Sequence, residues 1–366
     1  MHPGSRFPFT PYPEGWFAVS FSADLPPGGV RSIHAFGRQL VLFRTASGQA
    51  VVSDAFCPHL GAHLGYGGRV EGEVLICPFH GFGYGPDGTC RQSPYGVPTP
   101  TRLRVLPLHE THGVILLHHD DEGAPPAWRT PELPTEGWTP LASHHWRIRT
   151  HPQETTENSV DAGHLAVLHG FSDLETTRPL TTDGPYLHTA YRMTRHAAAL
   201  GLRVPVPIDF DVHVHGLGHS HVELHMAAFG GLRGRLLVLP TPIDGEYIDL
   251  RIGVAVEDPR LASGWGRLLG LVPFGLAAKL VRRISLAWAV HDVQRDVAIW
   301  ENKRYLEPPA LARGDGPIGP YRRWCRQFYG EGSLDGARDR AGSNGDPAEG
   351  GATAPSSHAA PTRTSG

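Results

Sequence analysis

Short segments rich in β-branched and aliphatic residues, separated by Gly/Pro turns, dominate the first part of the chain. The clearest are residues 39–45, 49–56, 72–79 and 112–119. This pattern predicts an all-β unit over residues 1–125. The composition then changes to proline and acidic residues at 120–128, as is typical of a linker.

The rest of the chain mixes strand-like and helical segments. Strands are predicted at 144–151, 202–216, 235–243 and 246–257, and helices at 154–169 and 260–305. The fold class expected is therefore α+β, with a second domain over residues 126–330. Residues 331–366 consist largely of Gly, Ala, Ser, Pro and Asp, which predicts a disordered tail.

Charge and targeting signals narrow the possible partners. The formal net charge of the 366 residues is −3, and no basic block stands out, so nucleic acid is not an expected partner. The N-terminus lacks a signal-peptide pattern, so a cytoplasmic location is expected. Residues 268–290 are apolar, but Pro273 interrupts them and Lys279, Arg282 and Arg283 lie among them. We therefore expect a partly buried amphipathic helix rather than a membrane span.

Two loops supply one cysteine and one histidine each: Cys57 with His59, and Cys77 with His80. Two thiolates on one iron and two imidazoles on the other form the mixed ligation of a Rieske [2Fe–2S] cluster. A structural zinc site is the alternative, although zinc sites usually begin with a close pair of cysteines. The other two cysteines, Cys90 and Cys325, lack a histidine at ligand spacing and are expected to be structural.

A second candidate metal site lies around residues 158–169, which contain Asn158, Asp161, His164 and His169. On a continuous helix Asp161 and His164 share a face, but His164 and His169 point about 140° apart. Both histidines can bind one metal only if the helix is distorted or ends between them, and the glycines at 163 and 170 allow this. The alternative is two unrelated histidines at a packed helix end.

Two later segments also carry potential ligands. Residues 291–305 offer Asp292, Asp296 and Glu301, of which Glu301 is also expected as a solvated charge on a helix face. Residues 211–225 are dense in histidine, and alternation places His213 with His215, and His219 with His221, on shared strand faces. Such strands can hold a third metal site, line a pocket or face solvent.

At these motifs the chain resembles the oxygenase components of Rieske non-haem iron oxygenases, over residues 10–330. The segments CPHLGAHLGYGGRV, CPFHGFGYGPDGTC and ENSVDAGHLAVLH, and the tail AIWENKRY…DGPIGPYRRWCRQFY, are most similar to the branch of 3-ketosteroid 9α-hydroxylases and cholesterol 7-desaturases. Phe82 stands where many members have Trp. The resemblance implies a helix-plus-antiparallel-sheet (helix-grip) catalytic domain with a deep apolar pocket.

The resemblance also implies residue roles. A mononuclear Fe(II) would be held by His164, His169 and Asp296, with Asp292 as the alternative third ligand. Asn158 and Asp161 would be catalytic-site residues. Asp161 would connect His164 to a cluster histidine, His80, of a neighbouring subunit in a head-to-tail homotrimer.

The activity implied is hydroxylation or desaturation of a hydrophobic polycyclic substrate, a steroid or sterol, with O₂. Electrons would come from NAD(P)H through a separate reductase or ferredoxin, because the chain shows no dinucleotide-binding fingerprint. The expected pocket regions, 200–208 and 268–290, contain no acidic residue. Arg195 and Arg203 keep an aromatic-ring oxygenase or O-demethylase open as alternatives. A Rieske electron carrier, the non-enzyme alternative, would need only the N-terminal domain.

Overall fold

The computed structural model describes residues 6–199, 202–227, 230–258 and 274–330. The predicted tail at 331–366 lies outside the described residues, as do residues 260–273 of the predicted second helix. The side chain of Arg203 is also outside the description.

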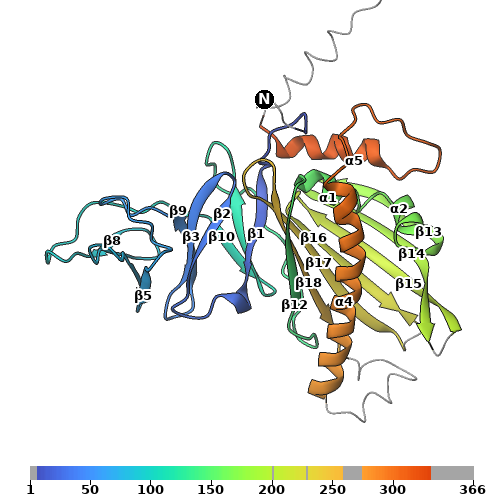
Figure 1. The fold of residues 1–366 in the computed structure, drawn as a ribbon, viewed down its shortest axis with the longest axis horizontal. Coiled ribbons are helices and arrows are strands. Elements are labelled where there is room, and N and C mark those ends of the chain that lie inside the picture. Colours follow the sequence, from blue (N-terminus) through green and yellow to red (C-terminus); the bar gives the residue numbers. More distant parts are fainter. Residues whose placement is uncertain (1–5, 200–201, 228–229, 259–273, 331–366) are drawn as a thin grey trace, which may run out of the picture.

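The N-terminal part of the described chain folds into three small antiparallel sheets, as the alternating pattern predicted (Figure 1). One contains β1 (Gly15–Phe21), β11 (Val114–His119) and β10 (Leu108–Thr111). The next contains β2 (Val30–Ala35), β3 (Arg38–Arg44), β4 (Ala50–Asp54) and β9 (Val105–Leu106). The third contains β5 (Arg69–Glu71), β6 (Val74–Ile76), β7 (Gly83–Tyr84) and β8 (Cys90–Gln92).

A single antiparallel sheet, here called the large sheet, dominates the second half of the described chain. Its strand order is β12-β18-β17-β16-β15-β14-β13. The strands are β12 (Ala142–Ile148), β13 (Ser172–Asp183), β14 (Tyr186–Ala199), β15 (Leu202–His215), β16 (His219–Met226), β17 (Leu232–Pro242) and β18 (Ile248–Val256). No apolar pattern in the sequence predicted β13 or β14. β13 is an edge strand that is mostly exposed, so it carries little hydrophobic alternation.

Helices lie against one face of the large sheet (Figure 1). They are α1 (Pro152–Glu157), α2 (Gly163–Val167), α4 (Phe274–Trp300) and α5 (Ile318–Cys325). Two 3₁₀ turns are also present, η1 (Ser22–Asp24) directly after β1 and η4 (Arg326–Phe328) directly after α5. The segment predicted as one helix at 154–169 is two short helices joined by a turn. The α+β class is confirmed. Among the described residues, no helix combines the length and apolarity needed to cross a membrane.

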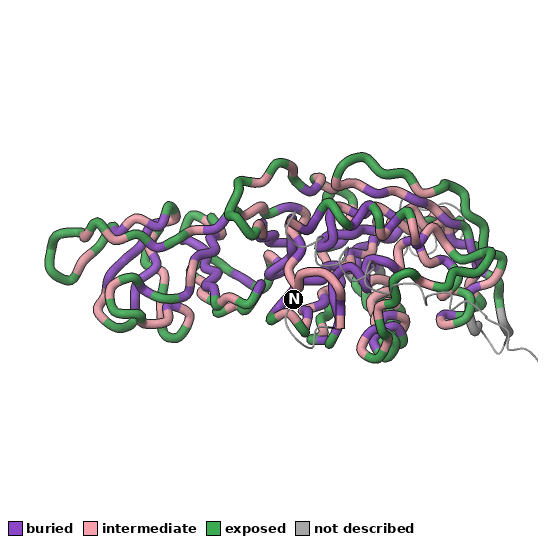
Figure 2. The backbone as a smooth tube through the Cα atoms, turned by 90° about the horizontal axis from the view of Figure 1, so that it is seen from above, coloured by how far each residue is buried: buried purple, intermediate pink, exposed green. Residues whose placement is uncertain are grey.

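The two faces of the large sheet differ in chemistry because successive side chains on a strand point to opposite sides. The face toward the helices is apolar: Leu250 and Ile252 pack against Val293 and Val297 of α4. The opposite face is polar over β14–β16, and over β17 it packs against β1 and β11. Those two strands are buried almost throughout, and Figure 2 shows buried backbone in both halves of the molecule.

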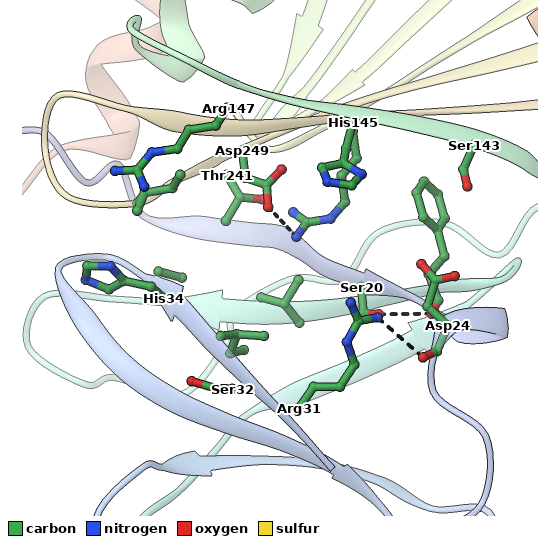
Figure 3. A pocket seen from close by; sticks show the side chains of 16 residues that line it. Ser20, Asp24, Arg31, Ser32, His34, Ser143, His145, Arg147, Thr241 and Asp249 are labelled. Carbon is green, nitrogen blue, oxygen red and sulfur yellow. Dashed lines mark hydrogen bonds and ion pairs between the residues drawn. The ribbon is translucent and has the colours of Figure 1, made fainter. Parts of the chain in front are cut away.

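A polar cleft of about 300 Å³ separates the N-terminal sheets from the large sheet near β2 and β12 (Figure 3). Arg31 and Asp24 lie on one wall, and Arg147 and Asp249 on the other. Beside them, Arg251 donates to the carbonyl of Ala18 at 2.8 Å, which ties the two parts of the chain together.

Candidate metal centres

The first centre is built from two loops with the same backbone pattern. In one, the N–H of Gly61 donates to the carbonyl of Cys57 at 2.9 Å, and in the other the N–H of Gly81 donates to that of Cys77 at 3.0 Å. Gly61 and Gly81 have φ of +76° and +74°, in the left-handed region that favours glycine. The same turn therefore follows each cysteine, although the histidine comes two residues after Cys57 and three residues after Cys77.

The thiol and imidazole donors of these two loops differ in burial. Cys57 and Cys77 are buried, whereas His59 and His80 are partly exposed, with ring centroids 4.9 Å apart. Burial raises the pKa of the Cys57 thiol, so a thiolate there requires a bound cation. Two thiols inside and two imidazoles outside suit the two differently ligated irons of a [2Fe–2S] cluster.

The surrounding side chains shape this site. The Tyr84 hydroxyl lies 3.3 Å from Cys57 Sγ, and the buried Phe82 ring lies 4.4 Å from the ring of His59. Phe82 therefore packs against His59 without offering an N–H group to the site. Cys90 and Cys325 are buried in separate apolar clusters, as expected of structural cysteines.

The second centre forms where α2 ends. α2 stops at Val167, so His169 lies beyond the helix. Of the two alternatives, a distorted helix or one that ends between the two histidines, the structure shows the second. Asp296 approaches from α4. Its Oδ1 lies 3.3 Å from Nε2 of His169 and 4.0 Å from Nε2 of His164. The donor atoms of these three residues all lie within 4.8 Å of one another.

Hydrogen bonds orient these donors. Asn158 Nδ2 donates to Asp296 Oδ1 at 3.2 Å. The carbonyl of Asp161 accepts from Nδ1 of His164, which leaves Nε2 of that ring directed at Asp296. The carboxylate of Asp161 is 3.8 Å from the same nitrogen, and its side chain is 40% exposed.

The electrostatics suit a divalent cation. Burial lowers the pKa of His164, so this imidazole is neutral at pH 7 and able to bind a metal. Asp296 is buried and faces the two imidazoles. A buried carboxylate in this position is stabilised by a cation between the three side chains. Two histidines and one carboxylate are also the donor set of non-haem Fe(II) oxygenases.

The other acidic residues of the same segment lie elsewhere. Asp292 forms a two-point salt bridge with Arg195, at 2.7 and 3.0 Å. Glu301 accepts from the backbone N–H of Arg149 at 3.3 Å. Of the three acids considered from the sequence, Asp296 is the one that the structure brings to the two histidines.

Sequence reasoning missed the ion pairs that hold α1 in place. Glu154 pairs with Lys303 at 2.7 Å, and Glu157 pairs with Arg322 at 2.7 Å. The sequence feature that could have indicated these pairs is the presence of two glutamates on a short helix next to an apolar segment. Acidic side chains that become buried in such a place need cationic partners. These pairs connect α1, and through it Asn158, to the C-terminal segment.

The structure can be compared with solved ones. It matches dicamba monooxygenase bound to 3,6-dichlorosalicylic acid with a TM-score of 0.67 and 17% identity, over 86% of this chain and 96% of that one. It also matches NdmB of Pseudomonas putida CBB5 with a TM-score of 0.63 and 16% identity, over 85% of this chain and 89% of that one. At such low identity these matches show the fold alone.

Matches in sequence identify the family of this chain more specifically than the fold does. Residues 15–107 match the Rieske [2Fe–2S] domain, and residues 117–329 match the 3-ketosteroid 9α-hydroxylase C-terminal domain. Cholesterol 7-desaturase of Bombyx mori is 33% identical over 90% of this chain and 72% of its own length. The 3-ketosteroid-9-alpha-monooxygenase oxygenase component of Rhodococcus rhodochrous is 28% identical over 87% and 83%. The chain belongs to the Rieske oxygenases with a catalytic domain of the 3-ketosteroid 9α-hydroxylase type.

This membership confirms the predicted enzyme class and cofactors. The chain is a Rieske non-haem iron monooxygenase or desaturase with one [2Fe–2S] cluster and one mononuclear iron, and it receives electrons from a separate reductase or ferredoxin. The second domain excludes a pure electron carrier.

Proposed function

We propose that this oxygenase hydroxylates or desaturates a steroid or sterol at a ring carbon. The observation that carries the proposal is the apolar, helix-facing side of the large sheet. Phe210, Val222, Leu224 and Met226 lie there on β15 and β16 and are only partly buried. Covering partly exposed apolar surface with a rigid apolar ligand is favourable by roughly 25 cal/mol per Å². The relatives named for cholesterol and for 3-ketosteroids support the same substrate class.

Arg195 bears on the alternative of an aromatic acid. A benzoate-like substrate needs a cation facing its carboxylate, and Arg195 was a candidate for that role. Asp292 forms two hydrogen bonds with the guanidinium of Arg195. The ring centroids of Phe171 and Trp288 each lie 5.3 Å from the Cζ atom of the same guanidinium. Its charge is therefore already neutralised within the protein, which favours an uncharged substrate.

For the iron centre we propose His164, His169 and Asp296 as ligands. When bound, the cluster supplies electrons one at a time and the mononuclear iron activates O₂. Three protein ligands leave coordination positions open for O₂ and water. Asn158 holds the carboxylate of Asp296 by its hydrogen bond, and the carbonyl of Asp161 fixes the tautomer of His164.

We propose that the cluster that serves this iron belongs to a neighbouring subunit. In one chain the loops of β5–β8 and the helix α2 lie at opposite ends of the molecule (Figure 1). The exposed carboxylate of Asp161 can accept a hydrogen bond from the partner subunit's His80. Around the two sites, apolar side chains are exposed: Leu60 by 66%, Phe79 by 62% and Val167 by 89%. A head-to-tail homotrimer would cover this surface.

We also propose that the chain is divided into two domains with different roles. Residues 1–125 would form the electron-accepting domain and residues 126–330 the oxygenating domain. The cytoplasm is the proposed location, because no disulfide joins any of the four cysteines, all of which the structure describes, and NAD(P)H-dependent reductases operate there.

The test is a substrate comparison with the full chain, a surrogate reductase and NADH. Cholesterol, a 3-ketosteroid and a methoxybenzoate are incubated separately, and products are identified by mass spectrometry. We expect oxidation of a steroid coupled to NADH consumption, and no product with Asp296→Ala. Coupled turnover of the methoxybenzoate alone would overturn the proposed substrate class.

A further inference from the structure

Three side chains converge on the polar face of the large sheet, the face opposite the candidate iron centre. His188 on β14 and His213 on β15 are direct cross-strand partners. Asp211 precedes His213 by two residues, so it projects from the same face. Nε2 of His188 lies 2.6 Å from Asp211 Oδ1, and Nε2 of His213 lies 3.3 Å from Oδ2.

The donor geometry is close to that of a metal site. The donor atoms of the three residues all lie within 4.8 Å of one another, and the two imidazole rings are nearly parallel, with centroids 4.4 Å apart. Donor atoms on one tetrahedral zinc are about 3.3 Å apart. The three side chains therefore need only small movements to share one ion.

Neighbouring residues hold the ring of His213 in position. The hydroxyl of Tyr186 lies 2.7 Å from Nδ1, the nitrogen that faces away from Asp211. The ring of His221 stacks on His213 with a centroid separation of 4.6 Å and an interplanar angle of 8°. A hydrogen bond to the second ring nitrogen is the usual support of a metal-binding histidine.

Charge distinguishes Asp211 from the nearby acids of this face. Asp209 pairs with Arg192 at 2.7 Å, and Glu223 pairs with Arg233 and Arg235 at 2.9 and 3.0 Å. Asp211 instead faces two imidazoles. A divalent cation between these groups would balance its charge as the arginines balance the others.

We propose that His188, Asp211 and His213 bind one Zn²⁺ ion, separate from the two iron sites, with water completing the coordination. Two imidazoles and a carboxylate are an established zinc donor set, and such sites bind zinc more tightly than Fe²⁺. With zinc bound, both Nε2 atoms are deprotonated and Nδ1–H of His213 donates to the Tyr186 oxygen. The ion would clamp β14 to β15 near the open edge of the sheet.

The test measures zinc on the iron-loaded full-length protein, with iron and zinc determined together by elemental analysis after equilibrium dialysis. We expect one zinc per chain with iron unchanged. Asp211→Asn and His188→Asn should weaken zinc binding by at least about tenfold, and Tyr186→Phe by a smaller factor. His225→Asn is the matched control, because His225 faces Asp209 on the same face at 3.5 Å without a second imidazole. It should bind zinc as the unaltered chain does.

Anomalous scattering at the zinc edge, from crystals of the unaltered protein soaked in zinc, makes the test independent of variant folding. A peak between His188, Asp211 and His213 supports the site. Zinc found only at the iron centre, zinc bound equally well by Asp211→Asn, or no zinc at all would overturn it.

Discussion

Arg195 on β14 and Asp292 on α4 form a two-point salt bridge, with Nη1–Oδ2 and Nη2–Oδ1 distances of 2.7 and 3.0 Å. The bridge fixes α4 against the large sheet one helical turn before Asp296. Because four residues complete about one turn, holding Asp292 on the sheet directs Asp296 toward His164 and His169. The salt bridge therefore helps to set which acid reaches the metal centre.

The first prediction separates these two acids. Asp296→Ala should lose the mononuclear iron and all turnover but keep the cluster, because it removes a proposed ligand. Asp292→Asn should keep the iron and lose about 1 kcal/mol of stability through its weaker pairing with Arg195. Iron content, the visible spectrum of the cluster and urea unfolding measure these effects. The reverse result, iron lost with Asp292→Asn and kept with Asp296→Ala, would show that the proposed ligand is wrong.

The second prediction concerns the cluster. Protein purified without oxygen should contain about three irons and two acid-labile sulfides per chain, and its reduced form should give a Rieske-type EPR signal. His59→Ala and His80→Ala should each abolish that signal. Cys90→Ala is the control and should retain it. Stoichiometric zinc without labile sulfide would contradict the assignment.

The third prediction addresses Asp161. Asp161→Asn leaves the backbone carbonyl that binds His164 in place, so both metal centres should be retained. The exposed carboxylate is lost, and with it the proposed connection to the partner subunit's His80. Turnover should therefore fall by on the order of a hundredfold, while EPR and iron content stay unchanged. Loss of the mononuclear iron in this variant would instead indicate a purely local role.

The fourth prediction is a pH dependence of stability. His112, at the tip of the β10–β11 hairpin, lies 3.1 Å from His219 on β16 through their Nε2 atoms. Burial lowers the pKa of His112 to about 4 and that of His219 well below 6.5. Below pH 6.5 the unfolded chain therefore binds protons that the folded chain does not. The contribution of these two histidines to the free energy of unfolding should be fully present above pH 6.5 and should be lost progressively as the pH falls toward 4.

Urea unfolding at pH 7.5 and pH 5 measures this loss. For His112 alone, the displacement of the pKa from 6.5 to about 4 corresponds to about 3 kcal/mol at full effect. His112→Asn removes one titrating group, and Asn tolerates the positive φ at this position. The variant should depend less on pH between 7.5 and 5. An unchanged dependence would show that other groups dominate.

Sequence patterns predicted the features that depend on residues close together in the chain. The Cys–His loops and the eight strands expected from apolar alternation are encoded by neighbouring residues, whereas the division of the segment 154–169 into two helices was not predicted. The pairing of Arg195 with Asp292 and the meeting of His188 with Asp211 depend on strand register between distant segments. β13 was missed because an exposed edge strand needs no apolar face, and β14 was missed with it.

The difference between the two faces of the large sheet limits how its strands can change. One residue inserted within β15 would turn the side chains beyond it to the opposite side, bringing His213 toward the apolar face and Val212 or Val214 toward the histidines. An insertion of two residues would keep each of these side chains on its original face of the sheet. Tolerated length changes within these strands should therefore come in even numbers, and odd ones should be confined to the connecting turns, such as residues 216–218 between β15 and β16.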